Sequence, residues 1–130
     1  MKTRIIIVDR HEDDAKALAA ILAKDDYRDS EISKNAADAI DLCLTSRFDV
    51  AFIATDLRDK DGFETCHELL KPLPMMYVVL IKTPYTERDI FLAKNSGAQG
   101  MLEKPFSKGA ILSTMNKFEL YRRMPRHHES

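Results

Sequence analysis

The sequence predicts a single α/β domain built on a doubly wound parallel sheet, and three observations lead to this prediction. Five strand-like runs alternate with five segments of helical periodicity. The runs lack apolar–polar alternation, as in Arg4–Val8 (RIIIV), which indicates strands covered on both faces. The intervening segments are long enough for right-handed helical crossovers. The 130 residues, of which 45% are hydrophobic and 32% charged, suit one globular domain.

The first helix is predicted to follow Arg4–Val8. Acids at positions 12–14 occupy its first turn, where their negative charges interact favourably with the positive end of the helix dipole. Its apolar residues recur at the spacing i, i+3, i+4 and i+7, as in an amphipathic helix. The apolar face consists of Ala15, Leu18, Ala19 and Leu22.

The next three elements are a strand, a helix and a strand. Ser30–Lys34 has one clearly apolar residue, Ile32, so as a strand it should lie at a sheet edge. Asn35 is expected to cap the second helix, with Asp38 at position N3. Val50–Ala54 makes the third strand. The apolar face of the second helix consists of Ala36, Ala39, Ile40 and Cys43.

The third helix is predicted after Asp61-Gly62 and ends before Pro72 and Pro74, because proline interrupts a helix. Met76–Ile81 then forms a fourth, buried strand. We expect one side of the third helix to carry Phe63, Cys66, His67 and Leu70.

The last two helices have clear boundaries. Thr86 and Asp89 make a capping box, and Gly97 suits a left-handed helix end. Met101-Leu102 is a short fifth strand, and Ser107 caps the last helix. The apolar face of this last helix consists of Ile111, Leu112, Met115 and Phe118.

Charge and cysteine content exclude several classes of function. The net charge is -1 and the pI is about 6.4, so nucleic acid and anionic membranes are not expected partners. Cys43 and Cys66 are too few for a disulfide framework, favour a reducing cytoplasm and are expected to pack in the core. The run Ile5–Val8 is too short for a signal core. We therefore expect a cytoplasmic protein without a membrane partner.

Chemistry is expected at the carboxyl ends of the strands, because ligands of doubly wound sheets bind there. Charged side chains gather at these predicted ends. The residues concerned are Asp9, Arg10, Ala54–Asp56, Lys82, Thr83 and Lys104.

Four segments carry a family resemblance. IIIVD occurs at the first strand, FDVAFI at the third, Asp61-Gly62 after it, and GAQGMLEKPF around the fifth. In this order and spacing they resemble the receiver domains of two-component response regulators, the CheY-like family. The resemblance implies a flavodoxin-like three-layer sandwich with strand order 2-1-3-4-5. It covers residues 1–121, and residues 122–130 are expected to form a basic tail or linker.

The resemblance also implies a chemistry. Family members transfer a phosphoryl group to an aspartate at the tip of the third strand. A magnesium ion held by acids after the first strand and a lysine neutralise the developing charge. The first of those acids matches Asp9, and the lysine matches Lys104.

The other functional positions depart from the family pattern. The second acid falls on Arg10, and the phosphoacceptor falls on Ala54, whose methyl group cannot form an acyl phosphate. The hydroxyl residue of the fourth strand falls on Lys82, and the switching aromatic falls on Met101. These departures predict a pseudo-receiver that is not an enzyme.

The predicted charges also argue against a metal. Asp9 and Asp56 contribute minus two, while Arg10, Lys82 and Lys104 contribute plus three, which gives plus one. Such a site repels a divalent cation, so we expect no magnesium and no other cofactor. The simpler interpretation is that Arg10 or Lys82 pairs with Asp56 and that Lys104 pairs with Asp9, at about 1 kcal/mol each.

The predicted function is protein–protein interaction in two-component signalling. By resemblance, the partner surface is the face of the fourth helix, fifth strand and fifth helix, around Lys94, Met101 and Lys117. A homodimer would form through the same face.

Two alternatives remain open. Asp56 shares strand parity with Ala54, so in a strand two residues longer it would be a displaced phosphoacceptor, with Arg10 and Lys82 replacing the metal. The strand tips would otherwise bind an anion or small ligand, such as a flavin phosphate, although the acids at positions 12–14 would repel phosphate.

Two further features are expected to be inert. His11 is a lone histidine at a helix start, where it is expected to be exposed and without a role. The basic tail is expected to be a linker to an output domain or a disordered end. Its cationic residues are Arg122, Arg123, Arg126, His127 and His128.

Overall fold

The computed structural model describes residues 2–82 and 86–124 of the chain. Five parallel strands form one sheet in the order β2-β1-β3-β4-β5, as the resemblance predicts. The strands are β1 (Arg4–Val8), β2 (Asp29–Ser33), β3 (Val50–Ala54), β4 (Tyr77–Lys82) and β5 (Gly100–Glu103). The helices are α1 (Glu12–Lys24), α2 (Ala36–Thr45), α3 (Gly62–Leu70), α4 (Glu87–Ser96) and α5 (Lys108–Arg123).

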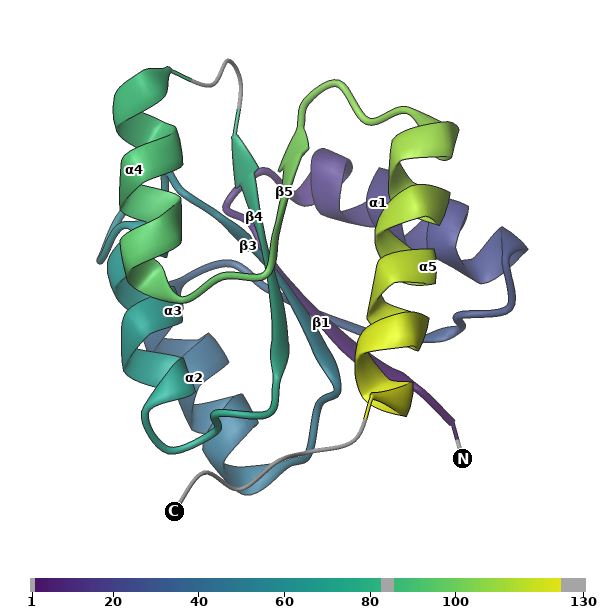
Figure 1. Cartoon of the computed structure of the whole chain (residues 1–130), viewed down its shortest axis with the longest axis horizontal. Helices are drawn as coiled ribbons and strands as arrows, with labels where there is room; N and C mark the ends of the chain where they lie inside the picture. The colour runs from purple at the N-terminus through teal and green to yellow at the C-terminus, as the bar shows by residue number, and fades with distance from the viewer. Residues whose placement is uncertain (1, 83–85, 125–130) are drawn as a thin grey trace.

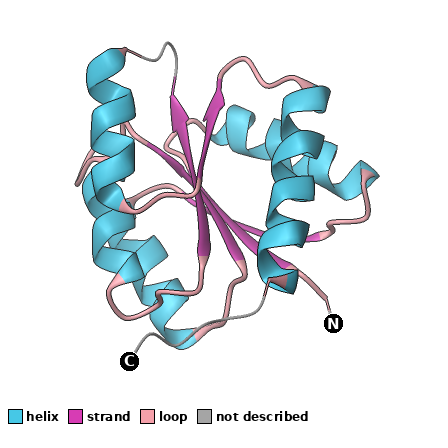
Figure 2. Cartoon of the chain, viewed as in Figure 1, coloured by secondary structure: helices cyan, strands magenta, loops and turns pink. Residues whose placement is uncertain are grey.

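The helices cover both faces of the sheet and so make three layers (Figures 1 and 2). Helices α1 and α5 lie on one face, and α2, α3 and α4 lie on the other. The strand β2 lies at the edge, as its single apolar residue indicated. No helix in the described ranges is both long and apolar enough to span a membrane.

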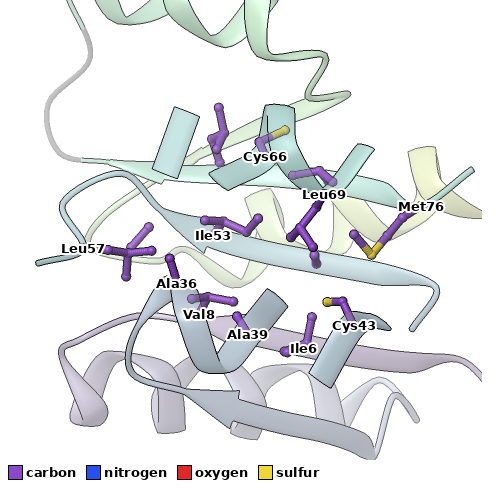
Figure 3. Close-up of a cluster of buried hydrophobic side chains, with 14 of the residues drawn as sticks. Ile6, Val8, Ala36, Ala39, Cys43, Ile53, Leu57, Cys66, Leu69 and Met76 are labelled. Atoms are coloured by element: carbon purple, nitrogen blue, oxygen red, sulfur yellow. The ribbon is translucent and has the colours of Figure 1, made fainter. Parts of the chain in front are cut away.

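The buried side chains form one cluster on each face of the sheet. In β1, Ile6 and Val8 pack into the cluster beneath α2 and α3, while Ile5 and Ile7 pack beneath α1 and α5. All four side chains are fully buried. Figure 3 shows the first cluster, in which Cys43 and Cys66 are part of the packing. The unbroken apolar run therefore reflects a strand covered on both sides.

The predicted helix caps are present. The side chain of Asn35 accepts a hydrogen bond from the N3 amide of α2, and Ser107 does the same for α5. Thr86 and Asp89 form a reciprocal capping box at α4. Gly97 ends α4 with φ of 90°, a conformation that suits glycine.

The predicted apolar face of α3 is wrong at its histidine. The helix buries Thr65, Cys66 and Leu69, whereas His67 is exposed. The sequence interpretation assigned the face from the larger apolar residues. The Thr65 hydroxyl donates to the Asp61 carbonyl at 2.8 Å, so this polar side chain can be buried beside Cys66.

The last helix is longer than expected. It continues through Arg123, so Arg122 and Arg123 are helical and do not belong to an extended tail. Arg122 also forms an ion pair with Glu119, with 2.8 Å between Nε and Oε1. The remaining basic residues of the expected tail, Arg126, His127 and His128, lie outside the described residues.

Candidate functional site

The sheet register brings the strand ends to one edge. Val8 pairs with Ile53, Ala54 with Ile81, and Lys82 with Glu103. The residues that follow or end these strands are therefore neighbours, although they come from distant parts of the chain. This edge is where the sequence predicted a site.

Lys104 lies between two carboxylates. Its Nζ is 2.8 Å from Oδ2 of the fully buried Asp9 and 2.7 Å from Oδ2 of Asp14. The second oxygen of Asp9 accepts the backbone N–H of His11 at 2.9 Å. Burial lowers the pKa of Lys104, but its hydrogen bonds to Asp14 and Asp9 outweigh this effect and raise the pKa overall. The expected pairing of Lys104 with Asp9 is thus present.

Asp14 was missed as a site residue by the sequence interpretation, which assigned it only to the first turn of α1. Adding its negative charge to the predicted sum of plus one gives zero. The available signal was its position three residues after His11, in the first turn of the helix that follows β1. The predicted excess of positive charge at this edge is therefore wrong.

Asp56 is bound by two neighbours from the loop after β1. Arg10 donates from Nε to the Asp56 backbone carbonyl at 2.9 Å, and its Nη2 atom lies 3.6 Å from Asp56 Oδ2. The Nε2 atom of His11 is 3.2 Å from the same carboxylate oxygen. His11 is exposed, as expected, and it contacts Asp56. Burial raises the pKa of Asp56, but His11, Arg10 and Lys104 together hold it below its usual value of 3.8.

Ala54 is the last residue of β3 and is 1% exposed. The loop after it returns closely, because a Cβ on Gly62 would lie 2.3 Å from the carbonyl oxygen of Ala54. Asp56 lies in the turn beyond the strand. The two-residue extension of β3 that a displaced acceptor requires is therefore absent from this segment.

Other acids of this loop cap helices. The two carboxylate oxygens of Asp59 accept the backbone N–H groups of Ala36 and Ala37, each at 3.0 Å. Asp61 accepts the N–H of Glu64 at 2.8 Å and so caps α3. Both carboxylates stabilise orphan donors at a helix N-terminus. The acidity of the loop is explained by capping.

Lys82 ends β4 and lines a small cavity of about 200 Å³ at the strand tips. The charged side chains that line this cavity are those of Lys82, Lys104, Asp14 and Asp56. Their formal charges cancel. An anion entering the cavity would meet two carboxylates, which weakens the anion-binding alternative.

The comparisons with known proteins assign the family. Residues 5–116 match the response regulator receiver domain. The chain therefore belongs to the family of response regulator receiver domains, which act in two-component signalling.

Solved structures share this fold. A two-component response regulator from Clostridium difficile has 21% sequence identity and a TM-score of 0.87. The aligned region covers 94% of this chain and 99% of that one. A CheY-like receiver domain protein from Methanospirillum hungatei JF-1 has 22% identity and a TM-score of 0.87, covering 95% and 98%. The beryllofluoride-activated NtrC4 receiver domain dimer has 28% identity and a TM-score of 0.84, covering 93% and 99%.

The residues at the strand tips do not fit the magnesium ion that the family implies. Ligand atoms of Asp9, His11 and Asp56 lie within 4.8 Å of one another. However, the Asp9 carboxylate lies 2.8 Å from Lys104, and the Asp56 carboxylate 3.6 Å from Arg10. Magnesium prefers oxygen ligands in octahedral geometry, and this set replaces one oxygen with an imidazole.

Proposed function

We propose that this receiver domain signals through protein contacts and does not accept a phosphoryl group on aspartate. The observation that carries the proposal is Ala54 at the carboxyl end of β3, the position that the resemblance assigns to the phosphoacceptor. Its methyl group offers no nucleophile. On this proposal the domain is a pseudo-receiver and not an enzyme.

The surroundings of Asp56 support the same proposal. Its carboxylate lies near the Arg10 guanidinium and the His11 imidazole, and its side chain is 51% exposed. An attacking carboxylate needs a free lone pair directed at a held phosphoryl group. The contacts of Asp56 instead tie the loops after β1 and β3 together.

We also propose that the site holds no magnesium. Lys104 and Arg10 lie where a bound cation would have to displace them from Asp9 and Asp56. In family members the metal offsets repulsion between clustered carboxylates. Here the side-chain cations perform that role.

The test is incubation with acetyl phosphate and magnesium, followed by intact mass measurement. We expect the wild-type chain and Asp56→Ala each to keep its own calculated mass, with no phosphoryl adduct on either. A receiver domain with an aspartate acceptor, treated in parallel, reports that the donor is active. A phosphoryl adduct on the wild type that disappears in Asp56→Ala would show that Asp56 is the acceptor and overturn the proposal.

For the partner surface, we propose the face formed by α4, β5 and α5. Lys94 and Lys117 are exposed on the two helices, and Met101 on β5 is 38% exposed. Phe91 on α4, which the sequence interpretation did not single out, is 64% exposed. Exposed aromatic and methionine side chains are typical of the centre of protein interfaces.

A further inference from the structure

A groove lies at the opposite end of the sheet from the strand tips, near the amino ends of β1, β3 and β4. Its volume is about 560 Å³. Four segments far apart in the sequence line it, namely Lys2, residues 47–49, residues 72–76 and residues 118–122. The Tyr121 hydroxyl donates to the Met75 carbonyl at 3.2 Å and joins two of these segments. Neither the proposed function nor the family chemistry uses this groove.

The lining of the groove is mainly apolar. It is lined by the buried side chains of Phe48, Met76 and Phe118. Met75 also lines it and is 47% exposed. Small-molecule sites are typically concave, apolar and between about 300 and 1,000 Å³ in volume. The groove falls within this range.

The charges of the groove are mostly positive. Lys2, Arg47 and Arg122 contribute plus three and Asp49, 3.9 Å from Arg47, contributes minus one. Glu119, which pairs with Arg122 at 2.8 Å, reduces the sum to plus one on a chain with a net charge of -1. Asp49 already accepts the backbone N–H of Arg4 at 2.9 Å. An anionic group is therefore attracted to the groove.

We propose that this groove binds a small amphipathic carboxylic acid. The aliphatic or aromatic body of the ligand would lie against Phe48, Met75 and Met76. The carboxylate would lie toward Arg47, whose side chain is 81% exposed, since guanidinium groups bind carboxylates through paired hydrogen bonds. The proposal does not depend on whether the domain is phosphorylated.

The test uses decanoate as the probe, below its micelle concentration, with amide chemical shifts of the full ¹⁵N-labelled chain as the readout. We expect saturable shifts confined to residues 47–49, 72–76 and 118–122. Decylammonium, which has the same chain and the opposite charge, should bind at least about tenfold more weakly, which corresponds to about 1.4 kcal/mol.

Two variants test the two parts of the ligand. Arg47→Glu should weaken decanoate binding at least about tenfold. Arg58→Glu makes the same charge change on the exposed loop beyond β3, so this control should leave decanoate binding unchanged. Met75→Ser should weaken decanoate binding by removing apolar contact. The amide spectrum of each variant reports whether it is folded.

Two outcomes would overturn the proposal. Equal binding of decanoate and decylammonium would remove the role of charge, and shifts centred on Phe91 would place the probe on α4.

Discussion

The carboxylate of Asp56 has two partners within the loop after β1, and this pairing determines how the residue titrates. Asp56 has a pKa below its usual value of 3.8, with burial opposing the shift and His11, Arg10 and Lys104 causing it. A lowered pKa means that folding favours the charged carboxylate. The resulting stability is present above the usual pKa and is lost as the pH falls through the lower pKa of the folded state.

Asp56→Asn should therefore lower the free energy of unfolding near neutral pH, because the variant loses the charged partner of Arg10. The difference from the wild type should shrink once the pH falls below the usual value of 3.8, since the Asp56 carboxylate is then protonated, first in the unfolded and then in the folded state, and becomes neutral like asparagine. Urea unfolding at a series of pH values measures this.

Asp13→Asn, a change at an exposed acid of α1, is the matched control and should show a smaller difference. A stability difference for Asp56→Asn that stays constant from neutral to strongly acidic pH would contradict the expectation.

The loop between β3 and α3 depends on one close backbone approach and two caps. Gly62 begins α3 directly against the Ala54 carbonyl, while Asp61 caps the same helix and Asp59 caps α2. This loop therefore connects β3 with α2 and α3, the two helices that it caps. Asp61 is required for its helix cap and Gly62 for the close backbone approach, independently of any chemistry at Ala54.

Gly62→Ala should destabilise the domain by about 1–3 kcal/mol or more, because the new Cβ would lie 2.3 Å from a backbone oxygen that cannot rotate away. Gly109→Ala, in the first turn of α5, is the control because its Cβ meets nothing within 4 Å. That control should be neutral or add up to about 1 kcal/mol. Urea unfolding measures the free energy of unfolding of both variants, and equal values would refute the close approach.

For the whole molecule, the two ends of the sheet have different characters. The carboxyl ends of the strands hold charges whose sum is zero, while the amino ends hold the apolar groove with its positive rim. The side formed by α4, β5 and α5 exposes apolar side chains, among them Ile90, Phe91 and Met101. An apolar patch on an otherwise charged surface is a candidate for contact with another protein.

Phe91→Asp should reduce recovery of partner proteins in co-purification with the tagged domain, or reduce its own dimerisation in light scattering, because it places a charge in the proposed interface. Leu44→Asp on α2 is the control, since Leu44 is 55% exposed but lies on a different helix. If Leu44→Asp lost the partners and Phe91→Asp kept them, the interface would have to be moved to α2.

Much of the fold could be predicted from the sequence because its signals are local. The β-branched run Ile5–Val8, the caps at Asn35 and Ser107 and the left-handed Gly97 depend on interactions within a few residues. The strand order came from the resemblance. The face of α3 was mispredicted because Thr65, which gives a weak apolar signal, is buried there.

The sequence alone determined the alternation of elements, the identity of the residues at the strand tips and the absence of a carboxylate at Ala54. Only the tertiary structure decided which charges pair. Lys104 contacts Asp14, 90 residues away, and His11 contacts Asp56, 45 residues away. Such contacts exist because parallel strands end at a common edge, where side chains meet according to sheet order and register. Periodicity along the chain carries no information about that geometry.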